Sequence, residues 1–424
     1  MQNKRLRGFL QNLALVLLSL SALFLLGSMP LFHISWTDQV QSLLAPHPAS
    51  GGHAQSSTLA DMFPSVHVMV TQDIEYRRYG RLYVPGDDPL LEQIIPLFQE
   101  ALGSASETGA SAELTLRSAL DSPCLYLDLT TQLPLEAVAA WLGETAGFSR
   151  EVRSMALTSE QEDTATLYLR SESGDIFRYN TALPVSAVRE VCGSQTSNGS
   201  IFAYESNYAP LDPYTVLVAE TPEAPAVQTE LPAAYSVYNL LTALDFNAHP
   251  LFRYTESSGA EVVEESPRTL RVSPDGAVSF TSRGEDASPL YQVPAAGEQP
   301  TMPECLSAAG RLAAALTEGT GASPLYLRAV EMAEGGCTVR FGYHAGAIPV
   351  FFSDEKDALS VTISGAAITA FTYRCRAYTP TEDTSPLLPA AMAQAIASLY
   401  PEAGLSVGYV DGGAGPLAAH WLAG

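Results

Sequence analysis

Ser353 and Lys356 stand at the spacing of the S-x-x-K nucleophile motif of penicillin-binding enzymes. That chemistry needs both side chains on one helical turn, with the lysine desolvated enough to accept a proton from the serine. Asp354 and Glu355 lie between them, and two neighbouring acids favour the protonated amine. The chain also contains no K-T-G sequence. The pattern therefore predicts a solvated turn between two strands rather than a nucleophile.

Histidines and cysteines are the next candidates for chemistry, because both bind metals and both take part in catalysis. The seven histidines form no H-x-x-x-H or H-E-x-x-H pattern, and the cysteines form no C-x-x-C pair. No G-x-S-x-G elbow, Walker loop, dinucleotide fingerprint or EF-hand loop occurs either. We therefore expect no catalytic residue, no metal and no cofactor, and we interpret the chain as non-enzymatic. A hydrolase site assembled from distant residues is the alternative.

The five cysteines lie far apart in the sequence, which is typical of buried apolar thiols rather than of a disulfide framework. Cys337 and Cys375 both fall in strand-like segments and are the best-placed pair if any disulfide forms. The five cysteines are Cys124, Cys192, Cys305, Cys337 and Cys375.

Composition limits the partners of this chain of 424 residues. Apolar residues make up 46% of the chain and charged residues 16%, which is typical of a folded protein. The net charge is −24, so the surface should repel nucleic acid and anionic lipid headgroups. We expect no nucleic-acid partner.

The first 32 residues carry the strongest signal for location. Lys4, Arg5 and Arg7 precede the apolar run Leu13–Phe32. Twenty helical residues at about 1.5 Å each cross the roughly 30 Å hydrocarbon core, and the basic flank stays in the cytoplasm. A cleaved signal peptide is the alternative, but no small-x-small cleavage site follows the run. The segment predicts an uncleaved, single-pass anchor in the cell membrane, with the bulk of the chain extracytoplasmic.

The predicted anchor also contains small and hydroxyl residues of the kind that let membrane helices pack closely. They are candidate partner-binding positions, although such residues also occur incidentally in generic anchors. The positions are Ser19, Ser21, Ala22, Gly27 and Ser28.

The rest of the sequence divides at changes of composition. A stretch rich in Gly, Ser and His predicts a flexible stalk, and a proline-rich acidic stretch predicts a linker. The predicted parts are the basic head and anchor (1–37), the stalk (38–63), a first extracytoplasmic domain (64–220), the linker (221–235) and a second extracytoplasmic domain (236–424).

Periodicity predicts that helices interrupt runs of antiparallel strands, which indicates an α+β fold. Asp87 and Asp88 are interpreted as the cap of a helix that runs to about Ala101. Residues Ala112–Leu120 fit a helix or a strand equally well. The other predicted helices are Leu135–Leu142, Pro184–Val191, Val237–Leu244, Cys305–Leu316 and Pro389–Tyr400. The predicted strands are Val66–Val70, Tyr76–Val84, Leu125–Leu129, Ala165–Arg170, Ile176–Tyr179, Thr269–Val272, Val278–Thr281, Leu325–Met332, Thr338–His344, Ile348–Phe352, Ala358–Ile363, Ile368–Arg376 and Leu405–Val410.

The two halves share a short string. A helix leads into Ser122-Pro-Cys-Leu-Tyr-Leu127 in the first half and into Ser323-Pro-Leu-Tyr-Leu327 in the second. The echo indicates an internal duplication, although coincidence is the alternative for so short a string.

The C-terminal third resembles a known family. The run Phe341–Val350 contains a turn with Gly346, Ile348, Pro349 and Val350. A strand-like segment, a Leu-Pro helix start and a final strand follow it, with Tyr409 and Trp421 in the tail. This order resembles the closing module of the YycH and YycI proteins, also called WalH and WalI. The segment from Leu251 to Thr281 also resembles the central region of YycH.

The resemblance implies a single-pass accessory regulator of a sensor histidine kinase of the WalK type. In that family the transmembrane helix pairs with those of the kinase, and the exterior domains associate with a related membrane-anchored regulator. We therefore expect a non-enzymatic regulator of an envelope-sensing two-component kinase. The alternative is an extracytoplasmic ligand- or peptide-binding module without a kinase partner.

Overall fold

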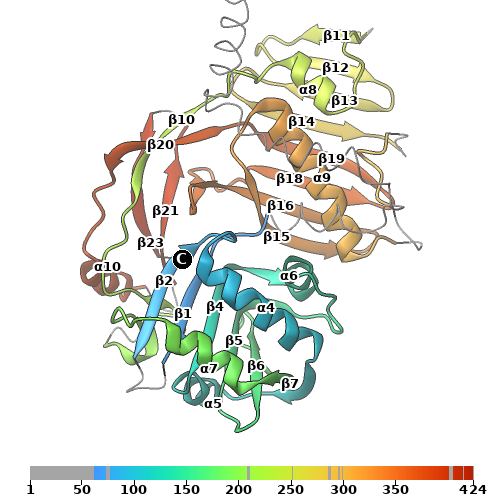
Figure 1. Cartoon of the computed structure of the whole chain (residues 1–424). Coiled ribbons are helices and arrows are strands. Elements are labelled where there is room, and N and C mark those ends of the chain that lie inside the picture. Colours follow the sequence, from blue (N-terminus) through green and yellow to red (C-terminus); the bar gives the residue numbers. More distant parts are fainter. Residues whose placement is uncertain are drawn as a thin grey trace, which may run out of the picture. The chain divides into compact units, whose positions relative to one another are not determined.

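A computed structural model describes residues 62–72, 77–207, 211–250, 252–284, 288–294, 297, 299–400, 404–413 and 415–423. The predicted anchor, with its basic flank and its small residues, and nearly all of the predicted stalk lie outside these ranges. No helix in the described ranges is both long enough and apolar enough to span a bilayer. The described chain has an α+β fold with seven α-helices, as the sequence predicts (Figure 1).

The first sheet has seven strands, and every neighbouring pair is antiparallel. Its strands alternate residues between two buried faces, so that Val68 and Val70 join one core cluster and Met69 joins another. In spatial order the strands are β2 (Arg78–Val84), β1 (Val66–Thr71), β4 (Cys124–Pro134), β5 (Glu151–Thr158), β6 (Thr164–Arg170), β7 (Ile176–Pro184) and β3 (Ser106–Ala110).

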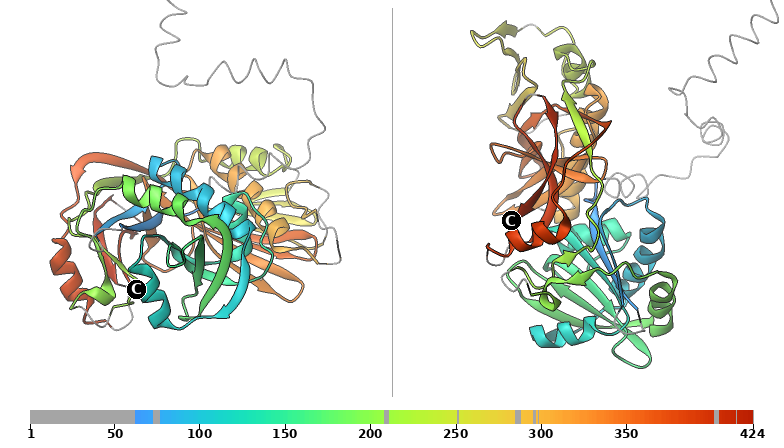
Figure 2. Two further views of the ribbon diagram at one scale, coloured as in Figure 1. Left: turned by 60° about the horizontal axis from the view of Figure 1, so that its bottom comes forward. Right: turned by 90° about the vertical axis from the view of Figure 1, so that its left-hand side faces the viewer.

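Helices cover both faces of this sheet. On one face lie α4 (Pro89–Gly103), α6 (Leu135–Leu142) and α7 (Val185–Ser194), with α4 beside α7 (Figure 2). On the other face lies α5 (Glu113–Leu120), the segment whose sequence fitted helix or strand. Helix α4 begins where predicted, because the Asp88 carboxylate accepts the N–H of Leu90 at 2.9 Å.

The second sheet has eleven strands and is covered by α9 (Met302–Thr320), against which α8 (Val237–Ala243) packs. A Thr301–Glu304 capping box starts α9, and Gly321 at φ +69° ends it. In spatial order the strands are β11 (Phe252–Thr255), β12 (Glu261–Glu265), β13 (Arg268–Val272), β14 (Ala277–Ser282), β19 (Ala367–Arg374), β18 (Leu359–Ser364), β16 (Gly336–Ala345), β17 (Ile348–Phe352), β21 (Leu405–Asp411) and β23 (Ala419–Ala423), with β15 (Leu325–Ala333) on the free side of β16.

The second sheet is mixed, whereas the sequence predicted antiparallel sheets. Strands β17 and β21 run parallel, with Val350 opposite Tyr409. The intervening chain contains three strands and α10 (Ala390–Ala397), which is long enough for the crossover that a parallel pair requires.

Two smaller sheets complete the described chain. One contains β20 (Ala377–Thr384), β10 (Pro225–Glu230) and β22 (Pro416–Leu417), and the other β8 (Ile201–Phe202) and β9 (Val216–Leu217), which flank a short 3-10 turn at Ala203–Glu205. The segment 221–235, predicted as a linker, thus contains strand β10, which hydrogen-bonds to β20 and β22. The domain boundaries drawn from composition remain predictions.

The S-x-x-K string and the cysteines, which the sequence offered as candidates for chemistry, have structural roles in the fold. Ser353 and Lys356 lie in the predicted turn after β17, and the Lys356 side chain is 69% exposed and contacts Asp354 at 3.4 Å. All five cysteines are buried free thiols, as expected. The thiol of Cys337 is hydrogen-bonded to that of Cys305 on α9 rather than paired with Cys375.

Arg78 on β2 connects the first sheet to neighbouring loops through ion pairs and a hydrogen bond. Its side chain is 1% exposed, forms ion pairs with Asp121 (3.0 Å) and Glu205, and donates from Nε to Thr71 Oγ1 at 3.1 Å. Such a charge is tolerated in the interior only when it is paired and hydrogen-bonded.

We expect Arg78→Met to lower the free energy of unfolding of the full chain by about 3 kcal/mol, because it strands two partly buried carboxylates. Arg81→Met is the matched control. Arg81 lies on the same strand, but its side chain is 46% exposed and, among the described residues, pairs only with Asp88, so its loss should cost at most about 1 kcal/mol. Urea unfolding measures both, and equal losses would contradict the assigned role of Arg78.

Candidate functional site

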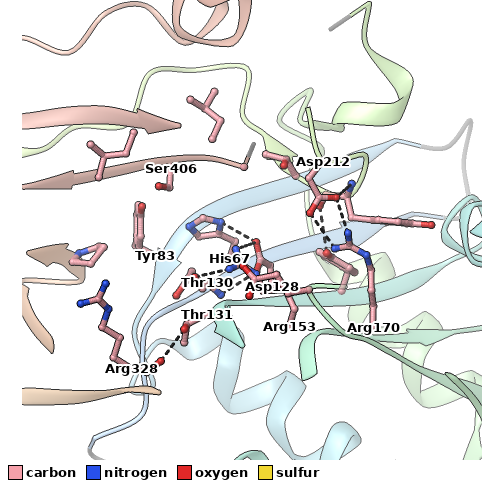
Figure 3. A pocket seen from close by; sticks show the side chains of 18 of the residues that line it. His67, Tyr83, Asp128, Thr130, Thr131, Arg153, Arg170, Asp212, Arg328 and Ser406 are labelled. Carbon is pink, nitrogen blue, oxygen red and sulfur yellow. Dashed lines mark hydrogen bonds and ion pairs between the residues drawn. The ribbon is translucent and has the colours of Figure 1, made fainter. Parts of the chain in front are cut away.

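A cavity of about 330 Å³ lies where the first sheet meets the second (Figure 3). Its volume is near the lower end of the range for small-molecule sites, about 300–1,000 Å³. We call it the inter-sheet cavity. The first sheet contributes His67, Tyr83, Tyr126, Asp128, Thr130, Thr131, Arg153 and Arg170, and the second contributes Tyr326, Arg328, Pro349, Phe351, Leu405, Ser406 and Leu422.

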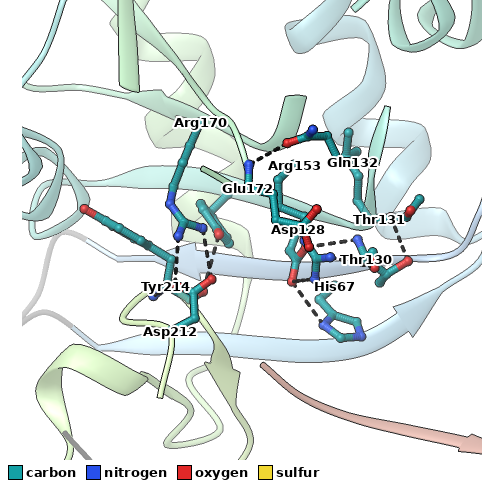
Figure 4. Close-up of polar contacts among 12 residues, drawn as sticks. His67, Asp128, Thr130, Thr131, Gln132, Arg153, Arg170, Glu172, Asp212 and Tyr214 are labelled. Atoms are coloured by element: carbon teal, nitrogen blue, oxygen red, sulfur yellow. Dashed lines mark hydrogen bonds and ion pairs between the residues drawn. The ribbon is translucent and has the colours of Figure 1, made fainter. Parts of the chain in front are cut away.

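Asp128 is the centre of the wall formed by the first sheet (Figure 4). Its carboxylate accepts from Arg153 Nε at 2.8 Å and from the Thr130 backbone N–H at 2.9 Å, and it lies 3.5 Å from His67 Nδ1. The three partners come from β5, β4 and β1, which antiparallel pairing brings side by side. The pairing of the sheet therefore assembles this polar cluster from residues far apart in the sequence.

Burial alone would raise the pKa of Asp128, but its partners lower it by more. The charge of Arg153, the contact with His67 and the Thr130 N–H together hold the pKa of Asp128 well below its usual range. The carboxylate therefore stays charged, and it fixes the orientation of the Arg153 guanidinium and of the His67 imidazole.

His67 presents an unused nitrogen in this wall. The residue is 2% exposed, and its Nε2 has no hydrogen-bond partner among the described residues. Buried polar atoms are rarely left in this state, and each such case requires an explanation. Because no described hydroxyl or thiol lies within hydrogen-bond distance of Nε2, the cluster holds an imidazole and its carboxylate but no paired nucleophile. His67 Nε2 is therefore available for a hydrogen bond to a ligand.

Two backbone positions in the cavity wall are strained. Thr130 has φ +61° and Tyr83 has φ +52°, values that are outliers for β-branched or bulky residues. Strain of about 1–3 kcal/mol at each position persists only where the surroundings enforce it, and it concentrates at functional sites. Here Arg153 Nη1 donates to the Thr130 carbonyl at 2.8 Å, and the Tyr83 hydroxyl accepts the N–H of Val407 at 2.7 Å.

The opposite wall comes from β15, β17 and β21. Arg328 Nη1 donates to Asp357 at 3.0 Å, and its guanidinium lies 5.6 Å from the centre of the Phe351 ring. Nε and Nη2 of Arg328 have no hydrogen-bond partner among the described residues. Tyr326 stacks on His344 with ring centres 3.9 Å apart. This wall therefore combines free cationic donors with aromatic and apolar surface.

A second hollow of about 760 Å³ adjoins the inter-sheet cavity and shares part of its wall. Arg170 binds Asp212 with both terminal nitrogens, at 3.0 and 3.1 Å, and its guanidinium lies 4.7 Å from the centre of the Tyr214 ring. In Figure 3 this ion pair lies on the far side of the cavity from Arg328. Convergent polar groups on an aromatic background are typical of a binding site for a polar small molecule or peptide.

The residues predicted from sequence lie in three places. Gly346 makes the β16–β17 turn at φ +63°, and Ile348 and Val350 are buried in β17. Pro349, between them, lines the inter-sheet cavity. Lys4, Arg5, Arg7, Ser19, Ser21, Ala22, Gly27 and Ser28 lie outside the described residues.

Apart from Pro349, the cavity residues were not predicted from the sequence, because none of them forms a known spacing motif. One signal was available. The Leu-Tyr-Leu string that the two halves share contains Tyr126 in the first and Tyr326 in the second, and both tyrosines line the cavity.

No group of three or more His, Cys, Asp or Glu side chains is arranged to hold a metal ion within the ranges that the structure covers. No protein-family model, curated protein or solved structure matches the chain. The function is therefore argued from the site.

The depressed pKa of Asp128 predicts an acid-sensitive contribution to stability. The folded-state pKa lies below the value of about 3.8 expected when unfolded, so this stabilisation is complete above about pH 4 and is lost as the pH falls further. Between pH 5 and pH 2, the free energy of unfolding of the Asp128→Asn variant should therefore fall by roughly 1–3 kcal/mol less than that of the parent. Urea unfolding at each pH measures both. The exposed Asp87 provides the control, since Asp87→Asn should keep the slope of the parent. Parallel curves for the parent and Asp128→Asn would contradict the assignment.

Proposed function

We propose that this chain is a non-enzymatic ligand- or peptide-binding module of the cell envelope, held at the membrane by a single N-terminal anchor. The observation that carries the proposal is the inter-sheet cavity, in which a buried imidazole nitrogen has no partner among the described residues and two backbone positions are strained. A preformed hollow with few, fixed polar groups lowers the ordering cost of binding. The acidic exterior, at a net charge of −24, argues against nucleic acid as the ligand.

The lining indicates a small ligand with both polar and apolar parts. Arg328 offers Nε and Nη2, for which the described residues provide no hydrogen-bond partner, and His67 Nε2 offers a further polar contact on the opposite wall. Phe351, Pro349 and Leu422 supply the apolar surface. Fragments of the cell wall, which carry short peptides, satisfy this description in the expected compartment.

Arg328→Met should abolish ligand binding, and the loss of stability should be limited because Arg340 remains 3.7 Å from Asp357. The test is a thermal-shift titration of the full chain in detergent with purified muropeptides and with dipeptides. Saturation at a hundred times the dissociation constant stabilises the folded state by about 2.7 kcal/mol, so the parent should show a rise in the melting temperature. The shift should be absent in the variant.

Arg340→Met is the matched control for this titration. Arg340 also contacts Asp357, at 3.7 Å, and has a similar exposure, but it does not line the cavity. It should keep the shift of the parent. If both variants lose the shift, or if no compound stabilises the parent, the proposed site is wrong.

As a second candidate function, we propose that the chain is an accessory regulator of an envelope-sensing two-component histidine kinase. The turn that carries the resemblance to the YycH and YycI family supports it, because Pro349 of that turn lines the cavity. The partners in this proposal are the kinase and a related membrane-anchored regulator. Regulation then follows when the chain contacts one state of the kinase more strongly than the other.

Replacing Leu13–Phe32 with an unrelated transmembrane helix should abolish this regulation, since the contact is expected to lie in the membrane. A transcriptional reporter of the kinase pathway gives the readout in cells. The control is a chain with an exchanged cytoplasmic head that keeps its positive charge, which should regulate normally. Unchanged reporter output after the helix exchange would contradict the kinase proposal and leave the ligand-binding proposal standing.

A further inference from the structure

Helix α10 presents an inverted surface, with small residues buried and large apolar residues exposed. Ala390, Ala393 and Ala397 are buried, whereas Met392 is 53% exposed and Ile396 is 47% exposed. An ordinary surface helix places its large apolar side chains against the core. The described chain has twelve exposed large apolar side chains, and five of them lie within the thirteen residues 388–400. We call these five the α10 stripe, which consists of Leu388, Met392, Ile396, Leu399 and Tyr400.

The orientation of α10 is fixed by its neighbours. Gln394 donates to the Val218 carbonyl at 3.2 Å, and the Ala390 N–H donates to Thr221 Oγ1 at 2.9 Å. Trp421 donates from its indole to the Leu388 carbonyl at 2.9 Å. The alanine face packs in a small core cluster with Leu405 and neighbouring residues. The helix therefore cannot rotate to bury the stripe without breaking these contacts.

The charges around the α10 stripe indicate which kind of partner could cover it. Residues 385–400 contain no Asp, Glu, Lys, Arg or His, in a chain with a net charge of −24. A cationic partner would find no acidic residue here. A membrane-surface helix carries Lys and Arg on its polar face, and this one carries none and follows Glu382 and Asp383. The matching surface is therefore neutral and apolar.

We propose that the α10 stripe is a self-association surface, where it meets the same stripe of a second copy of this chain. Two copies with an acidic exterior repel each other least where both are uncharged. In an antiparallel pair about a two-fold axis that crosses the exposed face between Met392 and Ile396, Met392 of one copy lies beside Ile396 of the other. The exposed Ala391 and Ala395 leave room for the helices to approach to about 8–10 Å.

The size of the stripe sets the expected strength. About two helical turns offer less than the roughly 800 Å² per partner of a standard interface, so the association should be weak and concentration-dependent. Cross-linking detects such contacts better than gel filtration does. The chain is well suited to it, because all five native cysteines are buried.

The test introduces one exposed thiol into the full chain. Cross-linking is then carried out on the chain purified in detergent and, separately, on isolated membranes that contain it. Ala395→Cys, near the expected two-fold axis, should give a dimer of about twice 45.1 kDa with a short bismaleimide. Glu334→Cys, at the exposed β15–β16 turn, is the control and should give at least fivefold less dimer.

A second set of variants separates contact from chance collision. Adding Met392→Glu and Ile396→Glu to Ala395→Cys should remove the dimer, because like charges would then face each other across the axis. Leu399→Glu, at a residue 75% exposed, provides an independent variant, and unchanged melting temperatures verify folding. The proposal is overturned by equal cross-linking at both thiols, by a dimer that survives the glutamates, or by an adduct of another mass in membranes.

Discussion

The buried carboxylate of Asp128 is the constraint on which the candidate site depends. A charge inside a protein must be compensated by opposite charge and hydrogen bonds, or it costs several kcal/mol. Arg153, His67 and the backbone of Thr130 supply that compensation. These contacts hold the guanidinium of Arg153, the imidazole of His67 and the strained backbone of Thr130 in place, and the three groups form part of one wall of the cavity.

One hydrophobic core cluster contains residues of both sheets, and hydrogen bonds also join the two walls at the cavity. Tyr83 of β2 bonds the backbone of Val407 on β21, and Thr131 donates to the Arg328 carbonyl at 2.8 Å. Both bonds run between the two sheets and both lie at the cavity. Tyr83 thus combines a positive φ with a hydroxyl that reaches the second sheet. A ligand that touches both walls adds to the same set of contacts.

The sequence predicts much of the fold and almost none of the site, and the reason is physical. Alternation and capping are local, so the strand at Val66–Val70, the helix start at Asp88 and the β16–β17 hairpin are confirmed. Strand β5 was not predicted, because Glu151 and Arg153 break its apolar pattern. Arg153 is polar there because it meets Asp128. The residues that build the site therefore weaken the local signal for the strand that carries them.

Long-range pairing accounts for the rest. His67 and Asp128 are opposite each other in the β1–β4 register, yet no spacing rule connects positions so far apart in the chain. The shared Leu-Tyr-Leu string is the exception, since it leads to Tyr126 and Tyr326 on facing walls. An internal duplication would account for equivalent tyrosines on the two walls, and it stays a prediction.

The two proposals share one segment, the β16–β17 turn, which lines the cavity of the first and carries the resemblance behind the second. Its Ala347 carbonyl accepts from Ser65, directly before β1, and its Pro349 lines the cavity. A ligand in the proposed site would therefore contact the turn that carries the resemblance and β1, the first strand of the described chain. A ligand shifts an equilibrium only by its differential affinity for two states. If both proposals hold, a ligand in the cavity affects the kinase only where its binding changes contacts that reach the membrane segment, because the kinase contact is expected there.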